Sequence, residues 1–284
     1  MPAHDLRLPD LRFLPVETLM PHERADSQRL APLVERLKGE AVLHNPPIVT
    51  PLSGSDGGDE RYVVLDGANR ASAARVAGFP HIVAQVVRYE EPEVRLLTWH
   101  HALTAFPKQE FEGACTRAPG LSCQPESLLH ARAMLARREI LAYACYPDGG
   151  VTAFHGGQDL HQRNDLLNAI VDLYRDRHRF FRTTTDSLEV ARVRHPEVTA
   201  LVVFPHFDPA EVLELATGGS LLPAGVTRHL VRWRALRVNV PVERLADASS
   251  SIEAKDQWLQ DWLMEKLARR QARFYEESTV LFDE

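Results

Sequence analysis

One stretch of the sequence, residues 62–80, combines the residue types that bind phosphate. Residues 62–65 form a β-branched and aromatic run, Asp66 and Gly67 interrupt it, and an Ala- and Arg-rich segment follows. A glycine turn that leads into a helix leaves unpaired backbone N–H groups at the positive end of the helix dipole. Arg70, in the first helical turn, could clamp a phosphate through two hydrogen bonds. The stretch therefore predicts an anion site.

Asp66 lies at the end of the predicted strand, a common position for a functional carboxylate or a Mg²⁺ ligand. An ordinary Asp-Gly turn, with Arg70 as a solvated charge, explains the same residues equally well. The stretch by itself leaves both interpretations open.

The elements expected around this stretch form a compact α/β unit of about a hundred residues. Leu30, Leu33, Val34 and Leu37 recur at helical spacing, and SGSDGGDE at 53–60 predicts a flexible turn. We expect strands over 12–19, 45–52, 62–65 and 81–89, and helices over 27–39 and 68–76.

Three further residues with chemical potential, Trp99, His100 and His101, lie in a mostly apolar run at 94–103. A core Trp beside a structural histidine explains this run as well as a binding site does. Because successive side chains of a strand point to opposite faces, we expect at most one of the two histidines to be buried.

The second part of the chain has a different pattern. Residues 107–125 lack periodicity and contain Gly and Pro, which predicts a crossover between a domain at 1–108 and another at 126–284. We find no internal repeat and no clear helix-turn-helix pattern. We expect helices over 127–139, 159–177, 208–219 and 252–274, a hairpin around 148–150, strands over 198–207 and after 227–229, and a final strand at 278–284.

Composition narrows the class of protein. With 44% hydrophobic and 25% charged residues, the 284-residue chain has a globular profile, and its net charge of −6 argues against a dedicated nucleic-acid binder. No run approaches the ~20 apolar residues that span a bilayer, and the N-terminus lacks a secretory pattern. Three cysteines, an odd count without CxxC spacing, give no zinc framework and fit a reducing cytoplasm. We therefore expect a cytoplasmic protein without membrane or nucleic-acid partners.

The order of motifs resembles the ParB/sulfiredoxin superfamily over roughly residues 10–90. The motifs are PHE at 21–23, NPPIV at 45–49 and DGANR at 66–70. Sulfiredoxin chemistry needs a cysteine in the glycine turn, where this chain has Ala68. ParB-type partition proteins carry a Glu-Arg-Arg turn and a helix-turn-helix, and this chain shows neither pattern.

The sequence is more similar to the branch of that superfamily that phosphorylates free L-serine to O-phospho-L-serine. This resemblance implies a mixed α/β (α+β) fold with a ParB/sulfiredoxin-like N-terminal domain, a larger C-terminal α/β domain and an active site in the cleft between them. It runs through nearly the whole chain, since it also rests on TWHH at 98–101, LPAGVTRH at 222–229, RALRVNVP at 234–241 and RFYEESTVLFDE at 273–284.

The resemblance also implies a role for each matching residue. Glu23 matches the family's catalytic glutamate and is the candidate general base; the structural alternative is an acid that complements the helix dipole. Glu17 is the local competitor, although it falls within the predicted first strand. Asp66 would assist catalysis or hold Mg²⁺. The nucleotide phosphates would contact Gly67, Ala68, Asn69 and Arg70, and serine would contact Trp99, His100, Thr227, Arg228 and His229.

Two classes of function remain at this point. The first is a small-molecule kinase, a phosphotransferase with an alcohol acceptor, that uses ATP or ADP with Mg²⁺. The second is a ParB-like nucleotide-binding regulator or DNA-binding protein without turnover. Three features favour the kinase: the acidic net charge, the missing helix-turn-helix, and the presence of both TWHH and Thr227-Arg228-His229. Arg228 suits the serine carboxylate, because a guanidinium binds a carboxylate through two hydrogen bonds.

Overall fold

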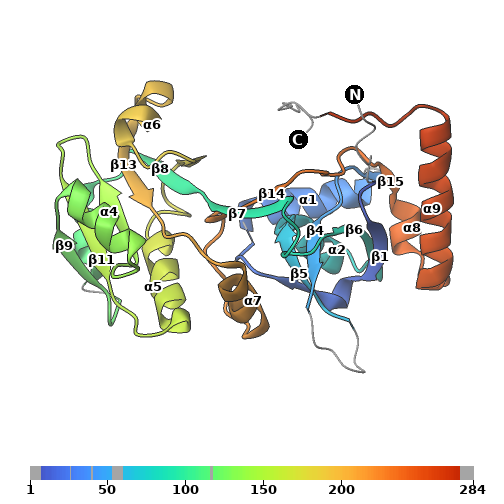
Figure 1. Ribbon diagram of the computed structural model, residues 1–284, viewed down its shortest axis with the longest axis horizontal. Coiled ribbons are helices and arrows are strands. Elements are labelled where there is room, and N and C mark those ends of the chain that lie inside the picture. The colour runs from blue at the N-terminus through green and yellow to red at the C-terminus, as the bar shows by residue number, and fades with distance from the viewer. Residues whose placement is uncertain (1–7, 26, 40, 53–59, 116–117, 276–284) are drawn as a thin grey trace.

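The computed structural model describes residues 8–25, 27–39, 41–52, 60–115 and 118–275. Two sheets, each with its own helices, lie at opposite ends of the molecule, and a two-stranded ribbon joins them (Figure 1). The fold is therefore mixed α/β, as the sequence predicts.

The first sheet has five strands and mixed direction, in the order β1-β6-β4-β5-β2. Its centre is the β-branched run of β5, where Val63 and Val64 are fully buried. Helices α1 and α2 pack against each other, and α9 packs against the edge strand β1 (Figure 1). The strands are β1 (Leu11–Pro15), β2 (Leu19–Pro21), β4 (Ile48–Pro51), β5 (Tyr62–Asp66) and β6 (His81–Val86); the helices are η1 (Val16–Thr18), α1 (Ser27–Gly39), α2 (Ala68–Val76) and α9 (Ile252–Ala268).

The second sheet is antiparallel, with six strands in the order β12-β8-β13-β10-β11-β9. Apolar residues of α4 and α6 belong to one core cluster, and those of α3, α5 and α7 belong to another. The strands are β8 (His100–Thr104), β9 (Ser122–Pro125), β10 (Ala142–Cys145), β11 (Val151–His155), β12 (Phe180–Thr183) and β13 (Val198–Val203); the helices are α3 (Lys108–Cys115), α4 (Leu128–Ala136), α5 (Leu160–Asp172), α6 (Leu188–Arg194) and α7 (Pro209–Thr217).

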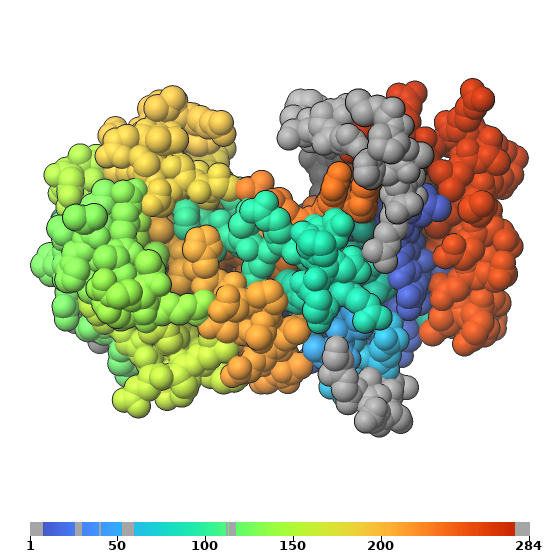
Figure 2. Space-filling view, in the orientation of Figure 1, coloured from blue at the N-terminus to red at the C-terminus, as the bar shows by residue number. Residues whose placement is uncertain are grey.

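The ribbon that joins the two sheets pairs β7 (Val94–Thr98) with β14 (Thr227–Val231) antiparallel. The chain leaves the first sheet through β7 and comes back through β14, and these segments fill the waist of the molecule in teal and orange (Figure 2). A smaller pair, β3 (Val42–Leu43) with β15 (Val240–Pro241), and helix α8 (Val242–Ala246) follow on the first side.

Because the chain returns through β14, each half of the molecule contains residues from both predicted domains, 1–108 and 126–284. The core around the first sheet includes Val240, Leu245 and Leu259, whereas β8 belongs to the second sheet. The division into units 1–108 and 126–284 stays a prediction about independent folding.

Some local predictions are wrong. Residues 107–125 are not an aperiodic crossover, because α3 and β9 lie there and Phe111 and Leu121 are core residues. The helix predicted over 252–274 ends at Ala268, and the helix predicted over 159–177 ends at Asp172. The predicted final strand and most of the predicted turn at 53–60 lie outside the described residues.

The expectation that only one histidine of the pair is buried is also wrong. His100 and His101 are 7% and 0% exposed. Their strand β8 lies between β12 and β13, and the residues packed on its two faces belong to different core clusters. Alternation along the strand therefore sends both rings into the interior.

Two observations bear on the environment of the chain. Among the described helices, none combines the length and the apolar character that crossing a membrane requires. Cys145 is a free buried thiol, whereas Cys123 is disulfide-bonded.

Candidate active site

A cleft of about 790 Å³ opens where the β7–β14 ribbon meets both sheets. Every residue assigned to the site from the sequence lines it, with the exception of His100. Those residues are Glu23, Asp66, Gly67, Ala68, Asn69, Arg70, Trp99, Thr227, Arg228 and His229.

Glu23 is held at the cleft by the returning chain. It follows β2 and forms a bridge with Leu222, and the neighbouring amides complete the pairing: Leu222 N–H donates to the His22 carbonyl at 2.8 Å. Its carboxylate accepts Gly225 N–H at Oε2 and Thr227 N–H at Oε1, each at 2.9 Å, and also the Thr227 hydroxyl. The competitor Glu17 is exposed on η1 and is not among the residues lining the cleft.

The surroundings of Glu23 fix its charge. Burial raises the pKa of a carboxyl, but the hydrogen bond and positive charge of His22, with the bonds from Thr227 and Gly225, lower the pKa of Glu23 to about 2. The side chain is therefore a carboxylate at neutral pH. Three hydrogen bonds, from Gly225 N–H, Thr227 N–H and the Thr227 hydroxyl, hold the carboxylate, and the His22 ring nitrogen lies 3.5 Å from Oε1.

Gly225 in turn is fixed from behind by His101. Burial lowers the pKa of His101 to about 3, so its ring is neutral. Nε2–H donates to the Gly225 carbonyl at 3.1 Å, and Nδ1 accepts the Tyr174 hydroxyl at 2.8 Å. His101 thus orients the peptide whose N–H holds Glu23. The TWHH motif contains His101, but the sequence by itself points to no role for it.

The phosphate-type part of the cleft is the start of α2. Gly67 is the helix N-cap with φ of 88°, and an added Cβ would lie 3.0 Å from Pro47. Only glycine fits this left-handed position without strain. Ala68, Asn69 and Arg70 form the first turn of α2, at the positive end of the helix dipole, and all three line the cleft.

Asp66 is paired with two arginines at the same place. Its Oδ2 contacts Arg234 closely and lies 3.6 Å from Arg70. Burial raises its pKa, but the charges of Arg234 and Arg70 more than offset this and lower it. Arg70 also donates to the Asn45 carbonyl at 2.6 Å, which ties the turn to the loop before β4.

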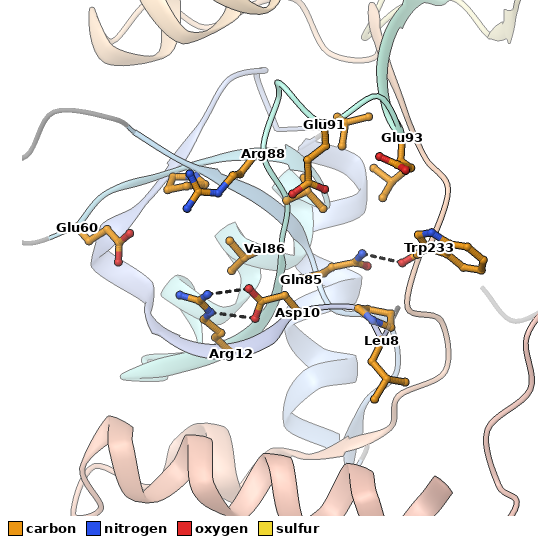
Figure 3. A pocket seen from close by; sticks show the side chains of 15 residues that line it. Leu8, Asp10, Arg12, Glu60, Gln85, Val86, Arg88, Glu91, Glu93 and Trp233 are labelled. Carbon is orange, nitrogen blue, oxygen red and sulfur yellow. Dashed lines mark hydrogen bonds and ion pairs between the residues drawn. The ribbon is translucent and has the colours of Figure 1, made fainter. Parts of the chain in front are cut away.

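Arg234 lines the cleft but is not among the site residues predicted from the sequence. Its backbone is fixed by Gln85. The Gln85 side chain donates to the Trp233 carbonyl at 2.8 Å and accepts Ala235 N–H at 2.9 Å, so it clasps the residues on either side of Arg234. Figure 3 shows Gln85 and its bond to Trp233 in a separate pocket of about 280 Å³. In the sequence, Arg234 is the first residue of the motif RALRVNVP.

The cleft is cationic although the whole chain is acidic. Two carboxylates, Glu23 and Asp66, face six guanidinium groups across the lining, in a protein of net charge −6. Such focusing raises the local concentration of anionic ligands. The arginines are Arg24, Arg36, Arg70, Arg182, Arg228 and Arg234.

The remaining predicted residues divide between two sides of the ribbon. The Arg228 guanidinium lies over the Trp99 ring at 4.4 Å, which leaves its edge for a carboxylate. His229 lines the cleft, but its Nε2 bonds the Tyr89 hydroxyl at 2.5 Å. His100 points instead into a neighbouring cavity of about 470 Å³, and its Nδ1 accepts Phe204 N–H at 3.3 Å.

The donor set restricts how a metal could be held. Within the part of the chain that the structure describes, no three His, Cys, Asp or Glu side chains gather as a metal site. Asp66 offers a single carboxylate beside the α2 N-terminus. One carboxylate does not complete the coordination shell of a divalent cation, so a metal ion here would need further ligands from a bound molecule.

The chain is similar in sequence to several proteins named as L-serine kinases. No protein-family profile matches the sequence. The chain is 36% identical over 91 residues to an ATP-dependent L-serine kinase of Staphylothermus marinus, a match that covers 32% of this chain and 34% of that protein. A similar match, to an ATP-dependent L-serine kinase of Desulfurococcus mucosus, covers 42% of that protein. The chain therefore spans less than half the length of these two relatives.

Two matches extend over nearly the whole chain. One is the ADP-dependent L-serine kinase SerK of Thermococcus kodakarensis, with 19% identity over 86% of this chain and 98% of that protein. The other is the ATP-dependent L-serine kinase SbnI of Staphylococcus aureus, with 21% identity over 96% and 97%.

Solved structures show the same fold. A free serine kinase in complex with AMP superposes with a TM-score of 0.71 at 18% identity, covering 86% of this chain and 98% of that chain. SbnI with a C-terminal truncation gives 0.67 at 20% identity, covering 90% and 97%. These findings confirm the resemblance to free L-serine kinases of the SerK and SbnI type.

Proposed function

We propose that this protein transfers a phosphoryl group from ATP or ADP to the hydroxyl of free L-serine, giving O-phospho-L-serine. The observation that carries the proposal is the cleft: an ionised, hydrogen-bonded Glu23 shares it with a helix N-terminus and six arginines. The similar proteins named as L-serine kinases support the same reaction.

The proposed roles follow from what phosphoryl transfer needs, which is alignment, charge neutralisation and an acceptor for the alcohol proton. The phosphates would bind the amides of residues 67–70 with Arg70 and Arg234. The serine carboxylate would bind Arg228, stacked on Trp99. The hydroxyl would face Glu23, which would take its proton as the terminal phosphoryl group moves to the serine oxygen.

The proposed reaction also uses Mg²⁺. Asp66 would hold it together with phosphate oxygens, and the ion would neutralise charge on the phosphates. Because Asp66 is paired with Arg234 and Arg70, phosphates that draw these arginines away would free the carboxylate for the metal.

The finer assignment of the fold is also a proposal. The five-stranded sheet with α1 and α2 would be the ParB/sulfiredoxin-like unit, and the cleft beside it the catalytic site. A kinase supplied with free nucleotide and free amino acid would work in the cytoplasm. The alternative, a ParB-like regulator or DNA-binding protein, predicts nucleotide binding without turnover.

³¹P NMR of the purified protein tests the reaction directly. L-Serine and Mg²⁺ are incubated with ATP or with ADP, and we expect a phosphomonoester signal that matches added O-phospho-L-serine. D-Serine and L-alanine serve as acceptor controls. Nucleotide binding in calorimetry without any phosphoserine signal from folded protein would reject the kinase and favour the regulator.

A further inference from the structure

The cavity of about 470 Å³ that contains His100 lies next to the catalytic cleft, and Arg228 lines both. Its other lining residues come from β7, β8, α4, β10 and β13 and from the segments that follow β12 and β13. None of the lining residues belongs to the first sheet or to α2. The cavity is therefore a space on the side of the second sheet that the proposed kinase reaction does not use.

The Tyr143 side chain brings an unsatisfied hydroxyl to this cavity. The residue is 1% exposed, and its hydroxyl has no hydrogen-bond partner among the described residues. Burial raises the pKa of Tyr143 to about 12, so the phenol keeps its proton. The Arg132 guanidinium lies beside the phenol and opposes this rise, but no aligned hydrogen bond joins them. A buried polar group without a partner is unfavourable, and an acceptor supplied by a ligand would remove that cost.

His100 adds a second donor to the same cavity. Its Nδ1 accepts Phe204 N–H at 3.3 Å, and burial lowers the pKa of the ring to about 4. The ring is therefore neutral at pH 7, with its single proton on Nε2. Within the described ranges no residue accepts that proton. Two side chains of this cavity thus present N–H or O–H groups that the protein leaves without acceptors.

The charges around the cavity leave one cation unbalanced. Three arginines and one aspartate line it. Arg132 Nε lies 3.0 Å from Asp186 Oδ2, and Arg138 contacts Glu211 closely. Arg228 has no carboxylate partner in the part of the chain that the structure describes. One unpaired guanidinium beside two donors matches a single carboxylate group, which accepts hydrogen bonds and carries one negative charge.

We propose that this cavity binds a small organic carboxylate, held by Arg228 and by hydrogen bonds from Tyr143 and His100. An occupant that holds Arg228 competes with the serine carboxylate in the cleft for the same guanidinium. The occupant therefore weakens serine binding, and serine weakens binding of the occupant by the same factor. This coupling rests on the proposed kinase function, whereas binding in the cavity does not.

NMR of protein with ¹⁵N-labelled histidine tests binding without turnover. The protein is titrated with sodium acetate, pyruvate or lactate, and with NaCl at equal ionic strength as the control. We expect a saturable shift of the His100 ring resonance, assigned by its loss in His100→Gln, with at least one carboxylate. His229, which lines the cleft, reports on binding there. Absence of a saturable His100 shift with all three carboxylates overturns the inference.

Tyr143→Phe removes the unsatisfied hydroxyl and keeps the ring. We expect carboxylate affinity at the cavity to fall by about tenfold or more, because a hydrogen bond to a charged group is lost. The matched control is Tyr146→Phe, a buried tyrosine outside the cavity whose hydroxyl donates to Thr152 at 3.3 Å; it should bind carboxylate normally. Equal affinity of wild type and Tyr143→Phe overturns the site.

Stability in the absence of ligand gives a signature that a packing role does not produce. Tyr143→Phe should unfold at a temperature equal to or above that of wild type, because it removes a buried group without a partner. Tyr146→Phe should unfold at a lower temperature, because it loses a hydrogen bond. A clear destabilisation of Tyr143→Phe would show that its hydroxyl is satisfied within the protein and would overturn the proposal.

Steady-state kinetics test the coupling. The carboxylate that shifts His100 should raise the KM for serine in wild type and in Tyr146→Phe, with a much smaller effect in Tyr143→Phe, while the KM for nucleotide stays unchanged. Equal inhibition of Tyr143→Phe and wild type would place the inhibitor in the serine site and overturn the coupling. A His100 shift that depends on Tyr143, in a protein that makes no phosphoserine, would support the cavity and reject only the kinase reaction.

Discussion

Thr227 donates its backbone N–H to Glu23 at 2.9 Å across 204 positions of sequence. The bond forms only when the chain has gone out through the second sheet and come back along β7. The proposed base is therefore placed by contacts between segments that are far apart in the sequence.

Glu23→Gln tests the base. We expect kcat to fall by ~10²–10⁴-fold, because an amide cannot take the alcohol proton. The amide also presents N–H to one of the donors at Gly225 or Thr227, so a destabilisation of ~1–3 kcal/mol should accompany the loss. The exposed Glu17→Gln is the control for turnover and for urea unfolding. Near-normal kcat in Glu23→Gln would move the search to Asp66.

Arg234 is expected to bind nucleotide phosphate, and Gln85 to position it. Arg234→Gln should weaken nucleotide binding by roughly tenfold or more, since a hydrogen bond to a charged group contributes ~1.5–3 kcal/mol. Gln85→Leu should act in the same direction by a smaller factor. Isothermal titration with ATP and ADP measures both. Arg232→Gln, two residues away and stacked on Trp233, should bind normally; an equal loss there would indicate a general charge effect.

Arg228→Lys should affect serine rather than nucleotide. A lysine can neither grip a carboxylate with two parallel bonds nor lie flat on the Trp99 ring. We expect the KM for serine to rise by about tenfold or more while nucleotide affinity stays within twofold. Steady-state kinetics with each substrate varied in turn distinguishes these. A change confined to the nucleotide would instead assign Arg228 to the phosphates.

Two glycines with positive φ make a matched pair for the phosphate turn. Gly67 has φ of 88° and Gly78 has φ of 76°, but an added Cβ at Gly78 meets nothing within 4 Å. Gly78→Ala should cost only the left-handed strain, ~1–2 kcal/mol. Gly67→Ala should cost more, because Pro47 is in the way, and should also reduce nucleotide affinity. Thermal unfolding and calorimetry on both proteins check this; equal behaviour of the pair would show that the close approach is unimportant.

Three buried histidines predict how stability depends on pH. Burial lowers the pKa of His100 to about 4 and of His101 and His229 to about 3, from 6.5 for an unperturbed histidine. The unfolded chain therefore binds more protons below pH 6.5, and the native state loses stability as pH falls. Each histidine contributes up to about 1.4 kcal/mol per pH unit. The contribution of Glu23 is lost only lower, between pH 4.5 and about 2.

Urea unfolding between pH 7 and pH 5 measures this slope. We expect His101→Gln to reduce the slope by about one proton, whatever it does to the absolute stability. A free energy of unfolding that does not change over this range would show that these rings are not buried neutral in solution.

The sequence by itself determined the parts of the site that are continuous in the chain. The strand, glycine turn and helix at 62–76 follow from local propensity, and the structure has them as β5, Gly67 and α2. Gly67 is identifiable because its backbone conformation excludes other residues. The motifs PHE, TWHH and TRH contain residues that meet in one cleft: His22, Glu23, Trp99, Thr227, Arg228 and His229 all line it, whereas the predicted site residue His100 does not.

Only the tertiary structure decided what those side chains touch. Trp99 lines the cleft whereas the adjacent His100 lines a different cavity, and the position of β8 inside the second sheet buries both histidines. Arg234 and Gln85 are 149 positions apart, so no local pattern could pair them. The contacts that hold Glu23 come from hydrogen bonds between distant segments, and such bonds depend on the path of the whole chain rather than on the residues beside it.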